Sequence, residues 1–156
     1  MQFTQPIITL DKKDASDKKI GIVRSLWNKE ITTRLLDGCF NELLKYGAKK
    51  TNITILNVPG SFELIHGGKK IVHDNKLDAV VIIGSIIKGE TPHFEFISQA
   101  VANGVKDLNI LFEIPFIFCV LTDLNLEQAM ARSGGIKGNK GADCAIAAIQ
   151  LIKHTK

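Results

Sequence analysis

A histidine in the stretch 77–96, LDAVVIIGSIIKGETPHFEF, is the residue of this chain best placed for acid–base chemistry. The apolar run ends in a polar turn, where Thr91 and Pro92 suit the N-cap and the first position of a helix. His93 then lies in the first helical turn, where free N–H groups and the helix dipole attract an anion. An imidazole beside an anion site can transfer protons at neutral pH, although a surface histidine without such a role is more common.

Three further residues that could contact a ligand follow predicted strands. Trp27, the one tryptophan, lies in a turn, where it is as well suited to stacking on a flat heterocycle as to covering the packing of the next helix. Phe62 has the same two uses and favours the core. Glu63 lies in a first helical turn, where interaction with the helix dipole is more common than ligand binding. These side chains are candidates for a site, but they do not identify its ligand.

Four apolar runs, each followed by a helical pattern, must position these residues. The runs are 20–23, 53–58, 79–87 and 116–121. Helical spacing of apolar residues predicts helices in 31–44, 61–75, 92–108, 125–133 and 143–154. Because the runs are apolar throughout rather than alternating, the strands should be parallel and covered on both faces. The fold class is therefore α/β: a three-layer α/β/α sandwich with a central four-stranded parallel sheet, plus a short N-terminal arm or strand.

The chain divides into an arm and one domain. Residues 1–19 are predicted to form the N-terminal arm, whose lysine-rich part, 12–19, is expected to be solvated. Residues 20–156 are predicted to form a single α/β domain. In a parallel sheet, ligands bind at the carboxyl ends of the strands, so the four strand-end loops should converge on one site.

Local signals predict how some helices begin and where a loop lies. Asn28 and Asn125 are expected N-caps, and Gln128 completes a capping-box pattern with Asn125. The glycine- and lysine-rich segment 134–141 is expected to be a flexible loop.

The composition argues against several classes of function. The 156-residue chain has a net charge of +4 and no basic stripe interleaved with aromatic residues, so nucleic-acid binding is not indicated. Its longest apolar run is far shorter than the about 20 residues of a membrane-spanning helix. Three scattered cysteines predict neither disulfides nor a zinc site and suit a reducing, cytoplasmic compartment. Glycine-rich nucleotide motifs, a nucleophile elbow and metal-ligand spacings are all absent from the sequence.

Four segments in this order resemble the lumazine synthase (6,7-dimethyl-8-ribityllumazine synthase) family: GIVRSLWN, VPGSFEL, GSIIKGETPHFEF and NLEQAMARSGGIKGNKGAD. The similarity runs from about Ile20 to Ile152, nearly the whole chain. It implies a transferase of riboflavin biosynthesis that condenses 5-amino-6-(D-ribitylamino)uracil with L-3,4-dihydroxy-2-butanone 4-phosphate. The products would be 6,7-dimethyl-8-ribityllumazine, phosphate and water, formed with no cofactor and no metal.

The resemblance also implies a role for individual residues. His93 matches the proton-transfer residue of the family. The pyrimidine and ribityl contacts would be Trp27, Ser61, Phe62, Glu63, Ser85, Ile86, Ile87 and, from an adjacent subunit, Phe118. The phosphate contacts would be Glu90, Thr91 and, from the neighbouring subunit, Arg132. Family members usually have phenylalanine at the position of Trp27 and often lysine at that of Ile136, whose charge Lys137 or Lys140 could replace.

The family builds homopentamers with active sites between subunits, and some members join twelve pentamers into a hollow icosahedral shell. A pentamer is therefore expected, and its assembly into a shell is left open: the compact 134–141 segment resembles shell-forming members, whereas Pro6 opposes shell formation. Two other functions fit the fold: an archaeal-type riboflavin synthase, which lacks the T-x-H-F segment, and a non-catalytic flavin- or lumazine-binding shell protein. The presence of His93 and Arg132 argues against the second.

Overall fold

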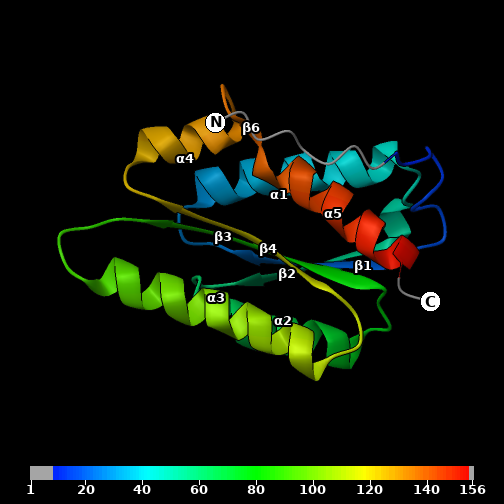
Figure 1. The fold of residues 1–156 in the computed structure, drawn as a ribbon, viewed down its shortest axis with the longest axis horizontal. Helices are drawn as coiled ribbons and strands as arrows, with labels where there is room; N and C mark the ends of the chain where they lie inside the picture. Colours follow the sequence, from blue (N-terminus) through cyan, green and yellow to red (C-terminus); the bar gives the residue numbers. More distant parts are fainter. Residues whose placement is uncertain (1–8, 155–156) are drawn as a thin grey trace.

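A computed structural model describes residues 9–154 of the chain, and the predicted extended segment around Pro6 lies outside this range. Four strands form one parallel sheet in the order β2-β1-β3-β4 (Figure 1). They are β1 (Ile20–Ser25), β2 (Ile53–Val58), β3 (Ala79–Ile87) and β4 (Phe116–Asp123). The predicted four-stranded parallel sheet is therefore confirmed.

Helices cover both faces of this sheet, which confirms the three-layer α/β/α sandwich (Figure 1). One face carries α1 (Lys29–Lys45), α4 (Leu126–Arg132) and α5 (Lys140–His154). The other carries α2 (Leu64–Asp74) and α3 (His93–Leu111). A single 3₁₀ turn, η1 (Lys50–Asn52), precedes β2. Each face of the sheet has its own apolar cluster beneath the helices, as the runs of buried strand residues predicted.

The burial of the central strand β3 explains why its apolar run predicted a strand of the sheet. β3 lies between β1 and β4, and every residue in it except Ile87 is buried. The edge strand β2 differs, because Ile55 is 41% exposed. The prediction that both faces are covered therefore holds for the middle of the sheet and only partly for this edge.

The two predicted asparagine caps behave differently. Asn125 accepts a hydrogen bond from the Gln128 N–H at 2.9 Å, and the Gln128 side chain accepts one from the Leu124 N–H at 2.9 Å, so this capping interaction is confirmed. Asn28 directly precedes α1, but its side chain makes no capping hydrogen bond. It adopts a left-handed backbone with φ of 52°, and its side-chain amide points elsewhere. Asparagine tolerates this conformation better than most residues.

The segment expected to be a flexible loop is ordered. Antiparallel strands β5 (Ser133–Gly135) and β6 (Gly138–Asn139) form a short hairpin there, and α5 begins directly after it. Gly134 and Gly138 have φ values of 106° and 81°, which glycine adopts without strain. The prediction of a loop was wrong because lysine and glycine content does not distinguish a tight hairpin from a disordered segment.

Part of the lysine-rich segment 12–19 packs on the domain rather than standing free in solvent. Ala15 is fully buried, and its N–H donates to the Tyr46 oxygen at 2.9 Å. Asp14 pairs with Lys153 of α5 at 2.9 Å. The expectation of a solvated segment is thus wrong at these positions, because one alanine among the charges is enough to anchor the turn in the core.

The three cysteines, one each on α1, β4 and α5, are free thiols buried in the same apolar cluster. They are Cys39, Cys119 and Cys144. Burial raises the pKa of the Cys39 thiol. The hydrogen bond between Cys119 and Cys144, together with burial, raises the pKa of the Cys119 thiol, whereas the same bond lowers the pKa of the Cys144 thiol.

Candidate active site

A cavity of about 590 Å³ lies where β1, β2 and β3 end. The turns that follow these three strands supply most of its wall, as expected for a ligand site on a parallel sheet. Nine of its lining residues are among the predicted site residues: Trp27, Ser61, Phe62, Glu63, Ser85, Ile86, Ile87, Thr91 and His93. Strand ends that are far apart in the sequence therefore bring most of the candidate residues together.

Two aromatic side chains flank the cavity and remain open to solvent. The exposed fractions are 71% for Trp27 and 61% for Phe62. The expectation from residue type that Phe62 belongs to the core is therefore wrong. Main-chain hydrogen bonds hold the two loops together, because Trp27 N–H donates to the Pro59 oxygen at 3.0 Å. Two exposed rings on adjoining turns suit the binding of a flat heterocycle.

The end of β3 forms a further wall of the cavity. Ser85 and Ile86 are both buried, and the side-chain amide of Asn28 donates to the Ser85 main-chain oxygen at 2.8 Å. The Ser61 hydroxyl lies over Gly84, where an added Cβ would approach it to 3.0 Å. Among the described residues, the hydroxyls of Ser61 and Ser85 have no hydrogen-bond partner.

The turn from β3 into α3 places Gly89, Thr91 and His93 at the cavity. α3 begins at His93 and Pro92 is its N-cap, so the predictions of Thr91 as the N-cap and Pro92 as the first helical residue are each wrong by one position. The Thr91 hydroxyl accepts a long hydrogen bond of 3.4 Å from the His93 N–H. His93 itself is exposed, so its imidazole can reach a ligand. The free N–H groups at this helix start favour an anion beside the imidazole.

Glu63 stands at the N-cap position of α2 and makes no capping hydrogen bond there. Its carboxylate folds over Gly60, since an added Cβ at that glycine would lie 2.9 Å from Glu63 Oε2. The side chain is exposed and also lines the cavity. This position leaves the carboxylate free to accept hydrogen bonds from a ligand, in addition to its favourable interaction with the helix dipole.

Three predicted site residues do not line the cavity of the single chain: Glu90, Phe118 and Arg132. Phe118 is 38% exposed on β4, and Arg132 ends α4 with its guanidinium 3.9 Å from the Asp123 carboxylate. Glu90 is exposed in the turn between Gly89 and Thr91.

Four lining residues had no predicted ligand contact: Gly60, Gly89, Phe94 and Ile97. The two glycines lie in strand-end loops that the sequence already indicated. Phe94 and Ile97 are three residues apart on α3, so helical spacing alone places them on a common face.

Sequence reasoning also assigned no role to Asp123, the last residue of β4. It is 5% exposed, and its Oδ2 has no partner among the described residues. Burial raises the pKa of this carboxyl, while the positive charge of Arg132 acts in the opposite direction.

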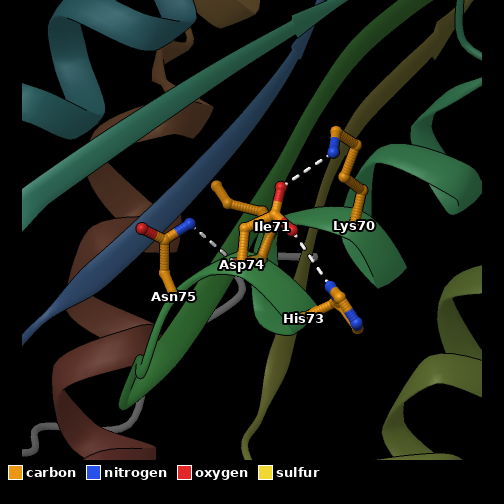
Figure 2. A network of polar contacts seen from close by, with 5 residues as sticks. All are labelled: Lys70, Ile71, His73, Asp74 and Asn75. Atoms are coloured by element: carbon orange, nitrogen blue, oxygen red, sulfur yellow. Dashed lines mark hydrogen bonds and ion pairs between the residues drawn. The ribbon is translucent and has the colours of Figure 1, made fainter.

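A separate polar cluster ends α2, at the opposite end of that helix from Glu63 (Figure 2). Asp74 accepts from Lys70 at 2.8 Å and lies 3.0 Å from the His73 imidazole, and these two hydrogen bonds lower the pKa of its carboxyl. Asn75 donates to the Ile71 oxygen at 3.0 Å. These contacts terminate a helix, and His73 remains a surface residue, as predicted. In residues 9–154 there is no group of His, Cys, Asp and Glu side chains that could hold a metal.

The fold is that of a three-layer α/β protein, and its cavity lies at the carboxyl edge of the sheet, beside the start of α3, where such proteins bind small ligands. The sequence model of 6,7-dimethyl-8-ribityllumazine synthase matches residues 17–156. The chain therefore belongs to this family of riboflavin-biosynthesis enzymes, and the resemblance read from its motifs is confirmed.

Individual relatives agree with this assignment, and each carries the name 6,7-dimethyl-8-ribityllumazine synthase. A protein of Christiangramia forsetii is 52% identical over 92% of this chain and 86% of the relative. Proteins of Parabacteroides distasonis and Clostridium kluyveri are 45% and 44% identical over 91% and 90% of this chain, covering 89% and 91% of their own lengths. Within the described part of the chain, the helices are too short or too polar to cross a membrane.

Proposed function

We propose that this chain condenses 5-amino-6-(D-ribitylamino)uracil with L-3,4-dihydroxy-2-butanone 4-phosphate to give 6,7-dimethyl-8-ribityllumazine, phosphate and water. The observation that carries the proposal is a single cavity in which Trp27 and Phe62 stand near the helix start that bears His93. The rings supply stacking surface for the pyrimidine, and the helix start supplies N–H groups for a phosphate. Membership of the family supports the same reaction.

The proposed condensation requires proton transfers rather than a cofactor. The 5-amino group forms an imine with the ketone and releases water. A C–H proton next to the imine is then lost and phosphate leaves, and the resulting enol becomes a carbonyl. The ribityl-bearing nitrogen attacks this carbonyl to close the ring and releases a second water. Each step moves protons on nitrogen, oxygen or the carbon next to the imine, and the exposed imidazole of His93 is placed to donate or accept them. Glu90 lies outside the cavity lining, which agrees with contact to phosphate through its main-chain N–H while its charge points away.

The site is completed by a second copy of the chain in a homopentamer. Phe118 and Arg132 are absent from the cavity lining, yet both reach the surface of the single chain. Arginine is the residue best suited to bidentate contact with phosphate, so a neighbouring Arg132 fits the phosphate end of the cavity. Assembly of pentamers into an icosahedral shell is a further option for the same subunit. Buried free thiols agree with a cytoplasmic location.

Product formation is the direct test. Purified protein with both substrates should generate lumazine absorbance above the uncatalysed rate, and His93→Ala should lower the rate roughly 10- to 100-fold, at the low end of general acid–base contributions. His93→Gln is the matched control, since it keeps hydrogen-bonding capacity but cannot carry the proton. If riboflavin quenches the Trp27 fluorescence of the wild-type protein but the protein forms no product, the proposal is contradicted and a non-catalytic binding role is supported.

Arg132 has its own test, which separates the two substrates. Arg132→Ala should raise the KM for the butanone phosphate and leave that for the pyrimidine nearly unchanged. A change confined to the pyrimidine would contradict the assignment of Arg132 to phosphate.

A further inference from the structure

Asp123, at the end of β4, contacts two elements that the proposed function assigns to phosphate binding: the turn of its own cavity, and the arginine that this chain supplies to the site of a neighbouring subunit. Its main-chain oxygen accepts the Lys88 N–H at 2.9 Å, which joins it to the start of the turn that carries Glu90 and Thr91. Its side chain lies 3.9 Å from the guanidinium of Arg132, measured from Oδ1 to Nη1. One residue thus touches both the turn before α3 and the arginine that ends α4.

The burial of this carboxylate is unusual. The side chain of Asp123 is 6% exposed, whereas that of Arg132 is 47% exposed. Within residues 9–154 the Oδ2 atom accepts no hydrogen bond, and the separation of 3.9 Å is an ion pair rather than a hydrogen bond. A buried carboxylate without full hydrogen bonding lowers the stability of the fold. We therefore expect Asp123 to contribute to function rather than to stability.

What the carboxylate can supply is a preferred position for the guanidinium. An exposed arginine explores many rotamers, and ordering it around a phosphate costs conformational entropy. A fixed negative charge beneath the guanidinium draws it towards the end of β4 and reduces that cost. Because the contact is long, the N–H groups of Arg132 remain available to a phosphate, which binds arginine best in a planar, two-point geometry.

We propose that Asp123 is a positioning residue that holds the Arg132 guanidinium in place for the phosphate-bearing substrate. The inference rests on the proposed function, in which Arg132 binds that phosphate. Asp123 touches no substrate in this scheme and acts only through Arg132. Its effect must therefore disappear when Arg132 is absent.

The test is a double-mutant cycle in the full-length, assembled protein. Asp123→Asn keeps the size of the side chain and removes its charge. It should raise the KM for the butanone phosphate roughly 2- to 10-fold, the cost of ordering one side chain, and leave the KM for the pyrimidine unchanged. In an Arg132→Ala background the same substitution should have no further effect. Asp123→Ser, a second uncharged variant, should reproduce the shift if Asn perturbs the fold.

A matched control separates the ion pair from a general change of charge. Glu127 lies exposed in the first turn of α4, and Glu127→Gln removes one negative charge from the same helix that carries Arg132. This variant should leave both KM values within twofold of wild type.

The outcomes distinguish failure of the proposed function from failure of the positioning role of Asp123. Absence of product from the wild type would overturn the proposed function itself. With an active wild type and a weakened Arg132→Ala variant, a KM for the butanone phosphate that is unchanged or lowered in both Asp123 variants would overturn the positioning role. An equal shift with and without Arg132 would do the same, since it would show that Asp123 acts by another route.

Discussion

The side-chain amide of Asn28 donates a hydrogen bond of 2.8 Å to the main-chain oxygen of Ser85, and this bond joins the turn after β1 to the end of β3. Trp27 precedes Asn28 directly, and Ser85 and Trp27 both line the cavity. The left-handed backbone of Asn28, with φ of 52°, aims its amide across the strand ends instead of towards α1. A residue expected only to cap a helix thus fixes two walls of the site relative to each other.

Replacement of Asn28 should separate its two contributions. Asn28→Gly loses the hydrogen bond but keeps the backbone freedom, so it should cost about 1 kcal/mol of stability. Asn28→Ala keeps a Cβ in the left-handed region but lacks the polar side chain that lets asparagine tolerate it, so it should cost about 1 kcal/mol more than Asn28→Gly. Denaturant unfolding of both variants measures the difference. Equal losses would contradict the role of the positive φ, and an unchanged KM for the pyrimidine in both would contradict the role of the bond in shaping the site.

Trp27 should matter for binding far more than for folding. Its ring is 71% exposed, so Trp27→Ala should change the free energy of unfolding by less than about 0.5 kcal/mol. Loss of a stacking surface, worth about 1–3 kcal/mol per base, should raise the KM for the pyrimidine roughly 5- to 100-fold. Trp27→Phe, the matched variant, should retain most of the affinity. The stacking role would be refuted by a Trp27→Ala variant with normal pyrimidine kinetics.

Gly141, the one glycine of α5, should tolerate substitution poorly. An added Cβ would overlap the main-chain oxygen of Leu35 in α1, so the two helices would have to separate. Gly141→Ala should therefore destabilise the protein by about 2–3 kcal/mol. Gly89→Ala is the control, because nothing lies within 4 Å of a Cβ at that position. Thermal unfolding of both variants measures the contrast, and equal melting temperatures would contradict the close packing of α1 on α5.

The Asp123 carboxyl should make stability depend on pH in a defined direction. Burial raises its pKa, against the opposing charge of Arg132, so the folded chain binds the proton more readily than the unfolded one. The resulting loss of stability is complete above the folded pKa and vanishes below the unfolded value of about 3.9.

Asp123→Asn removes this loss and should raise the Tm by a few degrees at pH 7. Its advantage over wild type should shrink as the pH falls towards 3. Melting curves recorded from pH 7 to pH 3 test this, and a variant less stable than wild type at pH 7 would count against the argument that this carboxylate is retained at a cost.

The sheet could be predicted because its strands are buried, but their ends could not be predicted from polarity. The runs 53–58 and 79–87 match β2 and β3 at both ends. β1 and β4 each continue two residues beyond the predicted run, through Arg24–Ser25 and Thr122–Asp123. Main-chain hydrogen bonds do not require apolar side chains, so a ladder can extend past the last hydrophobic residue.

The site was less accessible to sequence reasoning than the fold. Residue types at strand ends indicated where ligands should bind, and nine of the twelve site residues implied by the family resemblance do line one cavity. Residue types could not show that Phe62 faces outward, because composition says nothing of the direction in which a loop leaves its strand. Residue types alone also do not show that Phe118 and Arg132 lie outside that cavity; the family resemblance did, because it assigned both residues to a neighbouring subunit.

The burial of every native thiol also makes this protein convenient for chemical labelling. Cys39, Cys119 and Cys144 are the only cysteines in the chain, and all three lie in the core. Ile136, between the two strands of the hairpin, is 93% exposed. A cysteine introduced by Ile136→Cys becomes the single thiol presented to solvent, so a dye or cargo can be attached there by thiol chemistry without first removing the native residues.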